Sequence, residues 1–166
     1  MERQCLLLIE GDAADAKRMV DELSSTTEER FQVECVNTIS SGIERLRMKG
    51  VGAVILDLTL PDSGGIETFE KISPFASRLP ILILSGPDTE EIAKDAVQRG
   101  ALGYLVKKAD GNRLRWAVRT MSYYGIQATG CGRVRAGAEK RGAVRLVGTA
   151  SASGFIVGAI HTPAAR

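Results

Sequence analysis

The sequence lacks a membrane-spanning segment, since no uncharged apolar stretch reaches the roughly 18 residues that such a helix needs. The longest segment without Asp, Glu, Lys, Arg or His runs from Leu146 to Ile160 and is interrupted by Gly, Ser and Thr. The apolar run near the N-terminus is four residues long, too short for a signal peptide. We therefore expect a cytoplasmic protein with no membrane partner.

Cysteine and histidine are also scarce, which argues against a zinc site and against a disulfide framework. The three cysteines are Cys5, Cys35 and Cys131, and none of them belongs to a CxxC pair. The single histidine, His161, completes no zinc-like spacing. Because Cys5 and Cys35 fall in predicted strands, we expect both to be small buried residues without a disulfide.

Apolar segments alternate with helical patterns along most of the chain. Short apolar runs bounded by turn residues are typical of buried strands, and they occupy residues 5–9, 31–36, 51–56, 80–85 and 102–106. Amphipathic patterns with capping residues indicate helices over residues 13–24, from Thr38 or Ser40 to 49, over 65–73, from Asp88 to 99, and from Asp110 onward. Five such units predict a flavodoxin-like, doubly wound α/β fold with a five-stranded parallel sheet in the order 2-1-3-4-5.

Polar side chains follow the carboxyl ends of these strands. Asp57 ends the apolar run 51–56 and precedes a turn that contains Pro and Gly. In open α/β sheets, ligands bind at the carboxyl ends of the strands. We therefore expect one edge of the sheet to bring together Glu10, Asp12, Asp57, Ser85 and Lys107.

Clustered carboxylates of this kind suit a hard cation, because Mg²⁺ binds oxygen ligands and keeps several waters. A carboxylate can also attack a phosphoryl group and form an acyl phosphate. Positive charge from Mg²⁺ and Lys107 would favour that transfer, and the Ser85 hydroxyl could bond to the phosphate once formed. On its own, Asp57 would be interpreted as a helix cap or as an acid in a loop. Together with the four other polar residues at the strand ends, it favours a phosphoryl-transfer site.

Four segments resemble the receiver domain of two-component response regulators: residues 7–16, 54–65, 80–86 and 100–107. The match covers about residues 3–124 in the right order and spacing. It implies that Asp57 is the phosphoacceptor, Lys107 the phosphate-contacting lysine, Ser85 the switch hydroxyl and Tyr104 the switch aromatic residue. It further implies a metal site formed by acids after the first strand, by Asp57 and by the backbone carbonyl of Thr59.

Two positions depart from the receiver pattern. Receivers usually carry two adjacent acids after the first strand, and here the pair reads Glu10-Gly11, so Asp12 would have to supply the second metal ligand. Receivers also often have Pro after the lysine, where this chain has Lys108. Gly11 keeps an alternative open: a pseudo-receiver that signals by docking with weak or no phosphorylation.

An enzyme with an aspartyl nucleophile, such as a phosphohydrolase of the haloacid dehalogenase superfamily, is a second rival. That superfamily has another Asp two places after the first, and this chain has Thr59 there. The resemblance therefore implies a regulatory module that at most catalyses its own phosphorylation and dephosphorylation. The partners it implies are a histidine kinase or phosphotransfer protein, an unknown output partner and, as one option, a second copy bound through the fourth helix, fifth strand and fifth helix.

The last part of the chain differs in composition. We divide the chain into a receiver domain, residues 1–124, and a tail, residues 125–166, that holds eight glycines and nine alanines. The tail also carries six basic residues and one acid, but it lacks aromatic residues interleaved with them, so nucleic acid is not an expected partner. We expect a poorly structured or truncated extension, with weak strands at most near residues 146–149 and 154–158.

Overall fold

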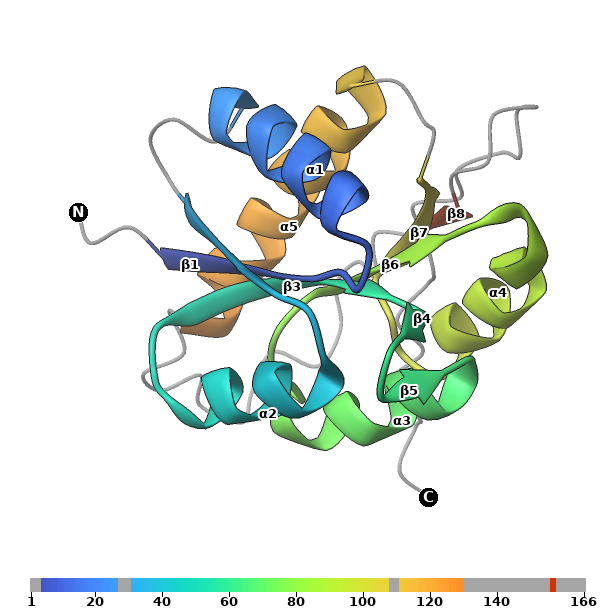
Figure 1. Ribbon diagram of the computed structural model, residues 1–166. Helices are drawn as coiled ribbons and strands as arrows, with labels where there is room; N and C mark the ends of the chain where they lie inside the picture. Colours follow the sequence, from blue (N-terminus) through green and yellow to red (C-terminus); the bar gives the residue numbers. More distant parts are fainter. Residues whose placement is uncertain (1–3, 27–30, 108–110, 130–155, 158–166) are drawn as a thin grey trace.

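A parallel sheet of five strands forms the centre of the protein. The computed structural model describes residues 4–26, 31–107, 111–129 and 156–157 (Figure 1). The strands lie in the order β2-β1-β3-β6-β7, and their bounds are Phe31–Val36 for β2, Gln4–Ile9 for β1, Val51–Asp57 for β3, Ile81–Ser85 for β6 and Gly103–Val106 for β7. Counted along the chain, this is the predicted order 2-1-3-4-5, and the flavodoxin-like prediction is confirmed.

Helices cover both faces of the sheet. Helices α1 (Ala13–Thr26) and α5 (Gly111–Thr129) pack on one face, and α2 (Ile39–Arg47), α3 (Ile66–Ile72) and α4 (Glu90–Gln98) lie on the other (Figure 1). Of the two predicted caps, Thr38 is the one that caps α2, because its Oγ1 accepts a hydrogen bond from the Ser41 backbone N–H at 3.1 Å. The helix nevertheless ends at Arg47, two residues before the predicted end.

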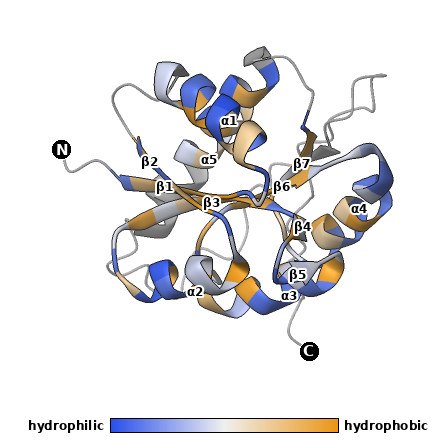
Figure 2. Ribbon diagram, in the orientation of Figure 1, coloured by the Kyte–Doolittle hydropathy of each residue, from blue (hydrophilic) through white to orange (hydrophobic). Residues whose placement is uncertain are grey.

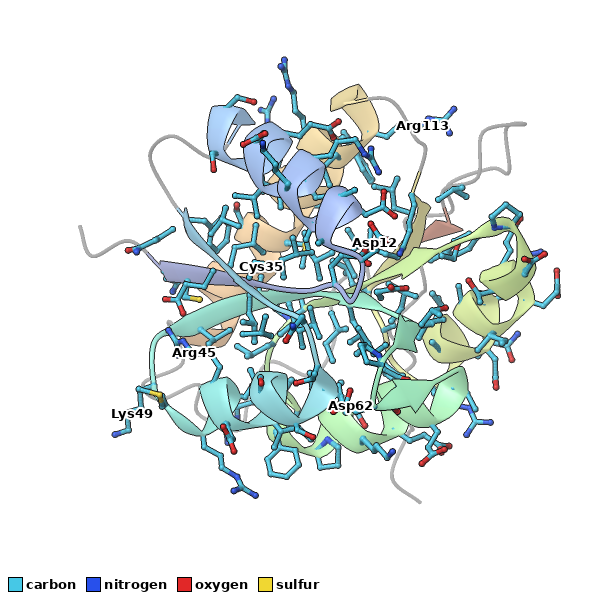
Figure 3. The ribbon with its side chains drawn as sticks, viewed as in Figure 1. Asp12, Cys35, Arg45, Lys49, Asp62 and Arg113 are labelled. Carbon is cyan, nitrogen blue, oxygen red and sulfur yellow. The ribbon has the colours of Figure 1, made fainter. Side chains whose placement is uncertain are left out.

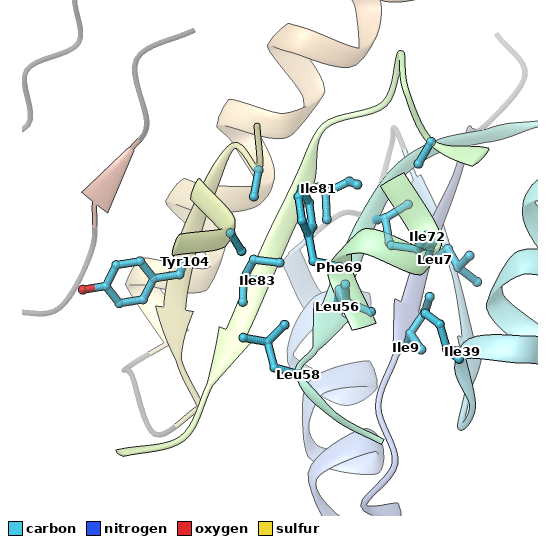
Figure 4. Close-up of a cluster of buried hydrophobic side chains, with 14 of the residues drawn as sticks. Leu7, Ile9, Ile39, Leu56, Leu58, Phe69, Ile72, Ile81, Ile83 and Tyr104 are labelled. Carbon is cyan, nitrogen blue, oxygen red and sulfur yellow. The ribbon is translucent and has the colours of Figure 1, made fainter. Parts of the chain in front are cut away.

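Alternating side chains of the buried strands supply two separate cores. Leu6 and Leu8 of β1 join the core under α1 and α5, whereas Leu7 and Ile9 join the core under α2, α3 and α4. Figure 2 shows the strands as a hydrophobic layer between helices with hydrophilic outer faces, and Figure 4 shows part of the second core. A sheet covered on both faces explains why these strands read as continuous apolar runs.

Two short elements that the sequence did not predict follow the end of β3. Strands β4 (Thr59–Leu60) and β5 (Ser63–Gly64) pair antiparallel and form a small hairpin between β3 and α3. The next residue, Gly65, has a φ of 65°, a left-handed conformation that favours glycine. The hairpin therefore fixes the path of the chain directly after Asp57.

Two sequence predictions about single residues were wrong. Asp88 does not cap α4, since it lies inside a 3₁₀ turn of residues 87–89, and α4 begins at Glu90. Cys35 is exposed, whereas Cys5 is buried. The reason is that β2 lies at the edge of the sheet, where the outer side chains reach solvent.

The C-terminal part adds two features. Helix α5 continues to Thr129, beyond the boundary predicted at Tyr124. Strand β8 (Ile156–Val157) pairs antiparallel with β7, and its two residues fall inside the predicted weak strand at 154–158. The predicted cap Asp110, the predicted strand at 146–149, Cys131 and His161 lie outside the described residues. No helix in the described residues is long and apolar enough to cross a membrane.

Candidate functional site

The carboxyl edge of the sheet brings together buried polar residues from four strands. Glu10 directly follows β1, Asp57 ends β3, Ser85 ends β6 and Lys107 follows β7. Glu10, Asp57 and Ser85 are at most 2% exposed. Parallel strands place their carboxyl ends on the same edge, so residues that are up to 97 positions apart in the chain come into contact.

Lys107 connects the two buried acids. Its Nζ donates hydrogen bonds to Asp57 Oδ2 at 2.9 Å and to Glu10 Oε1 at 3.0 Å. Burial alone would lower the pKa of Lys107, but the bonds to Asp57 and Glu10 outweigh it and raise the pKa. The ammonium group therefore stays charged and holds two carboxylates close together.

The pKa of Glu10 is raised in this arrangement. Burial raises the pKa of Glu10 to about 7, and the nearby charge of Asp57 raises it too, against the hydrogen bonds from Asp12 and Lys107. One lysine is shared by two buried acids, so the site keeps surplus negative charge when both acids are ionised. A cation that reached this edge would be attracted to it.

Two buried oxygens in this site have no hydrogen-bond partner, Glu10 Oε2 and Ser85 Oγ. A buried polar atom without a partner costs about 1–3 kcal/mol, so such atoms in a folded protein often serve a ligand. Both oxygens suit a phosphoryl group with its hard cation, since Ser85 Oγ can donate a bond and Glu10 Oε2 can accept one or face a cation. Oxygen atoms are also the ligands that Mg²⁺ prefers.

Asp12 has a different role from the other acids. Its Oδ1 accepts hydrogen bonds from the backbone N–H groups of Ala14 and Asp15, both at 2.9 Å, and so caps the N-terminus of α1 (Figure 3). These bonds, first that from Asp15, lower the pKa of Asp12. The cap holds one carboxylate oxygen of Asp12 at the N-terminus of α1. The role of Asp12 as a metal ligand stays a prediction.

Gly11 lies against the hairpin that follows Asp57. A Cβ atom added at Gly11 would stand 2.8 Å from Pro61 Cδ and 3.4 Å from the carbonyl oxygen of Thr59. The side chain of an acid at this position would therefore start next to the Thr59 carbonyl, but the hairpin would have to move to make room for its Cβ. Within the described residues, no three His, Cys, Asp or Glu side chains are grouped so that they could hold a metal ion.

The hairpin is tied to the rest of the domain by Asp62, a residue that the sequence analysis missed. Asp62 Oδ1 accepts a hydrogen bond from the Ile39 N–H at 2.9 Å, and Oδ2 accepts from the N–H and the hydroxyl of Ser40 at 3.0 and 2.8 Å (Figure 3). At the other end of the loop, the Thr59 N–H donates to Asp57 Oδ1 at 3.0 Å. The Pro-Asp pair signalled a turn, but nothing local showed that its acid binds a helix 22 residues away.

Tyr104 lies in β7 and is 1% exposed. Its hydroxyl donates a hydrogen bond to Glu90 Oε1 of α4 at 2.9 Å (Figure 4 shows the ring). Burial, with this bond and the charge of Glu90, raises the pKa of Tyr104. The predicted switch residue is therefore buried, and its hydrogen bond joins β7 to α4.

A second residue that the sequence analysis missed is Arg18 of α1. Its Nη2 donates a hydrogen bond to the backbone carbonyl of Lys107 at 2.8 Å. The pattern of α1 showed a charged outer face, but only the packing of α1 beside the end of β7 turns one of those charges toward the site.

These features define a class, the doubly wound α/β domains with an acidic site at the carboxyl edge of the sheet. A comparison with known families matches residues 6–119 to the response regulator receiver domain. The match covers most of the chain. The chain therefore belongs to the receiver domain family of two-component signal transduction, as the sequence motifs predicted.

Individual relatives agree with this assignment. The photosynthetic apparatus regulatory protein RegA of Rhodobacter capsulatus is 33% identical over 108 residues, which are 64% of this chain and 56% of RegA. The chemotaxis protein CheY of Treponema pallidum is 35% identical over 75 residues, 44% of this chain and 52% of CheY. The chain spans at most a little over half of the length of the first curated relatives that it matches.

Solved structures share the fold. The receiver domain of the sensor histidine kinase PA1611 from Pseudomonas aeruginosa, which has a magnesium ion coordinated in its active-site cleft, matches with a TM-score of 0.63 and 19% identity. That match covers 74% of this chain and 99% of the other. A response regulator structure from Chloroflexus aurantiacus matches with a TM-score of 0.65 and 20% identity, covering 74% and 99%.

Proposed function

We propose that this receiver domain takes a phosphoryl group onto Asp57 from a histidine kinase or a phosphotransfer protein, with Mg²⁺ as its cofactor. The observation that carries the proposal is the position of Asp57, which is buried and lies 2.9 Å from the Lys107 ammonium. Its strand pairs with β6, the strand that ends at Ser85, whose hydroxyl has no hydrogen-bond partner. A buried carboxylate beside a fixed cation and a free hydroxyl is suited to become an acyl phosphate.

The proposed reaction is a direct displacement. A carboxylate oxygen of Asp57 bonds to phosphorus while the bond from phosphorus to the donor atom breaks, and the bonding pair leaves with the donor. Lys107 then offers its ammonium to the phosphoryl oxygens, and Ser85 donates its hydroxyl hydrogen to one of them. Bound Mg²⁺ would supply further positive charge there, held by Asp57, the Glu10 carboxylate and the Thr59 carbonyl, with Asp12 as a further predicted ligand.

The phosphoryl group on Asp57 would carry a charge of roughly −1.5 to −2, in place of the single negative charge of the carboxylate. We propose that Ser85 moves toward the new phosphoryl oxygens and that Tyr104 changes its environment in response. The hydrogen bond of Tyr104 to Glu90 supports this route, since it links β7 to α4, next to the strand that ends in Ser85. This change would bias a two-state surface formed by β6, α4 and β7, which presents the signal to an output partner. A second copy of the chain, as one option, would bind through α4, β7 and α5.

The experiment is intact-mass measurement after incubation with Mg²⁺ and acetyl phosphate. The wild type should gain about 80 Da as one hydroxylamine-labile phosphoryl group, the chemistry of an acyl phosphate. Asp57→Asn should gain nothing, whereas Asp62→Asn, which changes an acid of the neighbouring hairpin, should still be modified. An undiminished adduct on Asp57→Asn would contradict the assignment.

The alternative is a pseudo-receiver, which keeps the fold and signals by docking. Gly11 favours it, because this position offers no acid and Pro61 lies where the Cβ of an acid side chain would be. The two functions differ in one readout. A pseudo-receiver shows no mass gain with Mg²⁺ and phosphodonor while the folded protein still binds its partner.

We also propose that residues 1–124 form the receiver domain and that residues 125–166 are an extension of it. The family match, which ends at residue 119, supports this division. Because α5 continues to Thr129, a separate receiver should be cut after that residue and not after Tyr124.

A further inference from the structure

Arg18 contacts the site through the backbone of Lys107. The bond from Arg18 Nη2 to the Lys107 carbonyl is 2.8 Å long and joins residues that are 89 positions apart. Two acids on the same helix hold the guanidinium in place, Asp15 with its Oδ1 3.3 Å from Nη2 and Glu22 with its Oε1 3.7 Å from Nη1. The acids lie one turn before and one turn after Arg18, so ion pairs on both sides restrict the orientation of its planar guanidinium group.

The backbone of Lys107 is held from both directions. Its N–H donates to the carbonyl of Ser85 at 3.0 Å, and its own carbonyl accepts the bond from Arg18. The lysine side chain is long and rich in rotamers, so the place that its ammonium reaches depends on where the backbone starts. The bond from α1 therefore helps to aim the ammonium at Asp57 and Glu10.

Asp15 adds a second effect. Its Oδ2 lies 3.6 Å from Lys107 Nζ, only slightly farther than the two buried acids, and its side chain is 36% exposed. Asp15 is thus a rival anion for the same ammonium. While Arg18 is present, Asp15 is shared with it, and Lys107 keeps its shorter bonds to Asp57 and Glu10.

We propose that Arg18 is a positioning residue for Lys107: it fixes the lysine carbonyl and occupies Asp15, which keeps the ammonium on Asp57. An ordinary surface ion pair would be worth little, and the pairs with Asp15 and Glu22 are of that kind. The bond to the Lys107 carbonyl is different, because it joins α1 to the residue after β7, whose ammonium donates a hydrogen bond to Asp57. The consequence for phosphorylation rests on the function proposed above, whereas the consequence for the position of Lys107 does not.

The first test needs neither metal nor phosphodonor. Lysines of the full chain are labelled with a limiting amine-acetylating reagent, and the rate at each lysine is read by peptide mass spectrometry. Lys107, whose side chain is 17% exposed, should label slowly in the wild type. Arg18→Met should raise its rate on the order of tenfold, the effect expected from losing one charge-assisted hydrogen bond. Lys17→Met, which removes an exposed charge of the same helix, should leave the Lys107 rate unchanged.

Two further variants separate the parts of the proposal. Arg18→Lys keeps the charge but replaces the fork by a single ammonium, so Lys107 should label at a rate between those of the wild type and Arg18→Met. It also serves if Arg18→Met does not fold. Adding Asp15→Asn to Arg18→Met should restore part of the protection, since the rival anion is gone. A double variant that labels as fast as Arg18→Met would overturn the role of Asp15.

The second test measures the rate of phosphorylation by acetyl phosphate with Mg²⁺, which should fall on the order of tenfold in Arg18→Met and stay constant in Lys17→Met. Equal labelling of Lys107 in the wild type and both Arg18 variants overturns the positioning role. If the wild type takes up no phosphoryl group, the proposed function fails, while the labelling rates still decide the role of Arg18.

Discussion

The stability of the wild type should depend on pH because of Glu10, and replacing Glu10 by Gln should remove that dependence. The pH window runs from 4.5, the ordinary pKa of a glutamate, to about 7, the pKa of Glu10 in the folded protein. Glu10 is 1% exposed, and its burial raises the pKa. Over this window the unfolded chain loses the proton while the folded chain keeps it, so ionisation favours unfolding. The stability contribution of the protonated acid is complete below pH 4.5 and lost as the pH rises through about 7.

The size of the effect follows from the two values. A rise from 4.5 to about 7, at about 1.4 kcal/mol for each tenfold change in proton affinity, gives about 3 kcal/mol. The charged groups that face Glu10 are Lys107 and Asp57, while Asp12 reaches it through a backbone N–H. The pKa of Lys107 is raised and that of Asp12 is lowered, so neither changes charge in this window.

The assay is urea unfolding at pH 5, 6, 7 and 8 with EDTA present, comparing the free energy of unfolding of the wild type and Glu10→Gln. The difference between the two should shift by about 2–3 kcal/mol in favour of the variant from pH 5 to pH 8, most of the full effect. Glu34→Gln is the matched control, because hydrogen bonds from Arg45 lower the pKa of Glu34. The free energy of unfolding of Glu34→Gln should change with pH in the same way as that of the wild type over this range. Parallel curves for Glu10→Gln as well would refute the account of this site.

Three further outcomes are expected. Asp62→Ala should lower the free energy of unfolding by about 1 kcal/mol, since it removes the bonds to the N-terminus of α2, and urea denaturation at pH 7 measures this loss. Gly11→Asp should tighten Mg²⁺ binding in calorimetric titration, and more so with Pro61→Ala, because an added Cβ would stand 2.8 Å from Pro61 Cδ; equal affinity in all variants would contradict it. Ser85→Ala should remain phosphorylated but lose the change at Tyr104, followed through the NMR signals of that ring, and a change as large as in the wild type would argue against the coupling.

Much of the fold and the membership of the site could be predicted from the sequence. Fully apolar strands require cover on both faces, and this fixes a parallel sheet whose carboxyl ends share one edge. That rule alone brought Glu10, Asp57, Ser85 and Lys107 together before any contact was known, and the structure places them within hydrogen-bonding distance or at the same edge.

Other features could not be predicted, because they depend on contacts between distant side chains. Asp62 and Arg18 look like ordinary surface charges in the sequence, and only the packing of the hairpin and of α1 gives each a backbone partner across the fold. Cys35 looks buried by composition, but its exposure depends on which strand lies at the edge. The two-residue strands β4 and β5 are too short to produce any periodic pattern.

The central claim is that Asp57 carries the phosphoryl group, and the most direct measurement locates the modified atom. The wild type is incubated with Mg²⁺ and acetyl phosphate, reduced with borohydride, which converts an aspartyl phosphate to homoserine, and digested for peptide mass spectrometry. Homoserine should appear at position 57, only when the phosphodonor has been present, and at no other acid of the site. Homoserine at Glu10, Asp12 or another position, or its absence from a protein that has gained a phosphoryl group, would contradict the account.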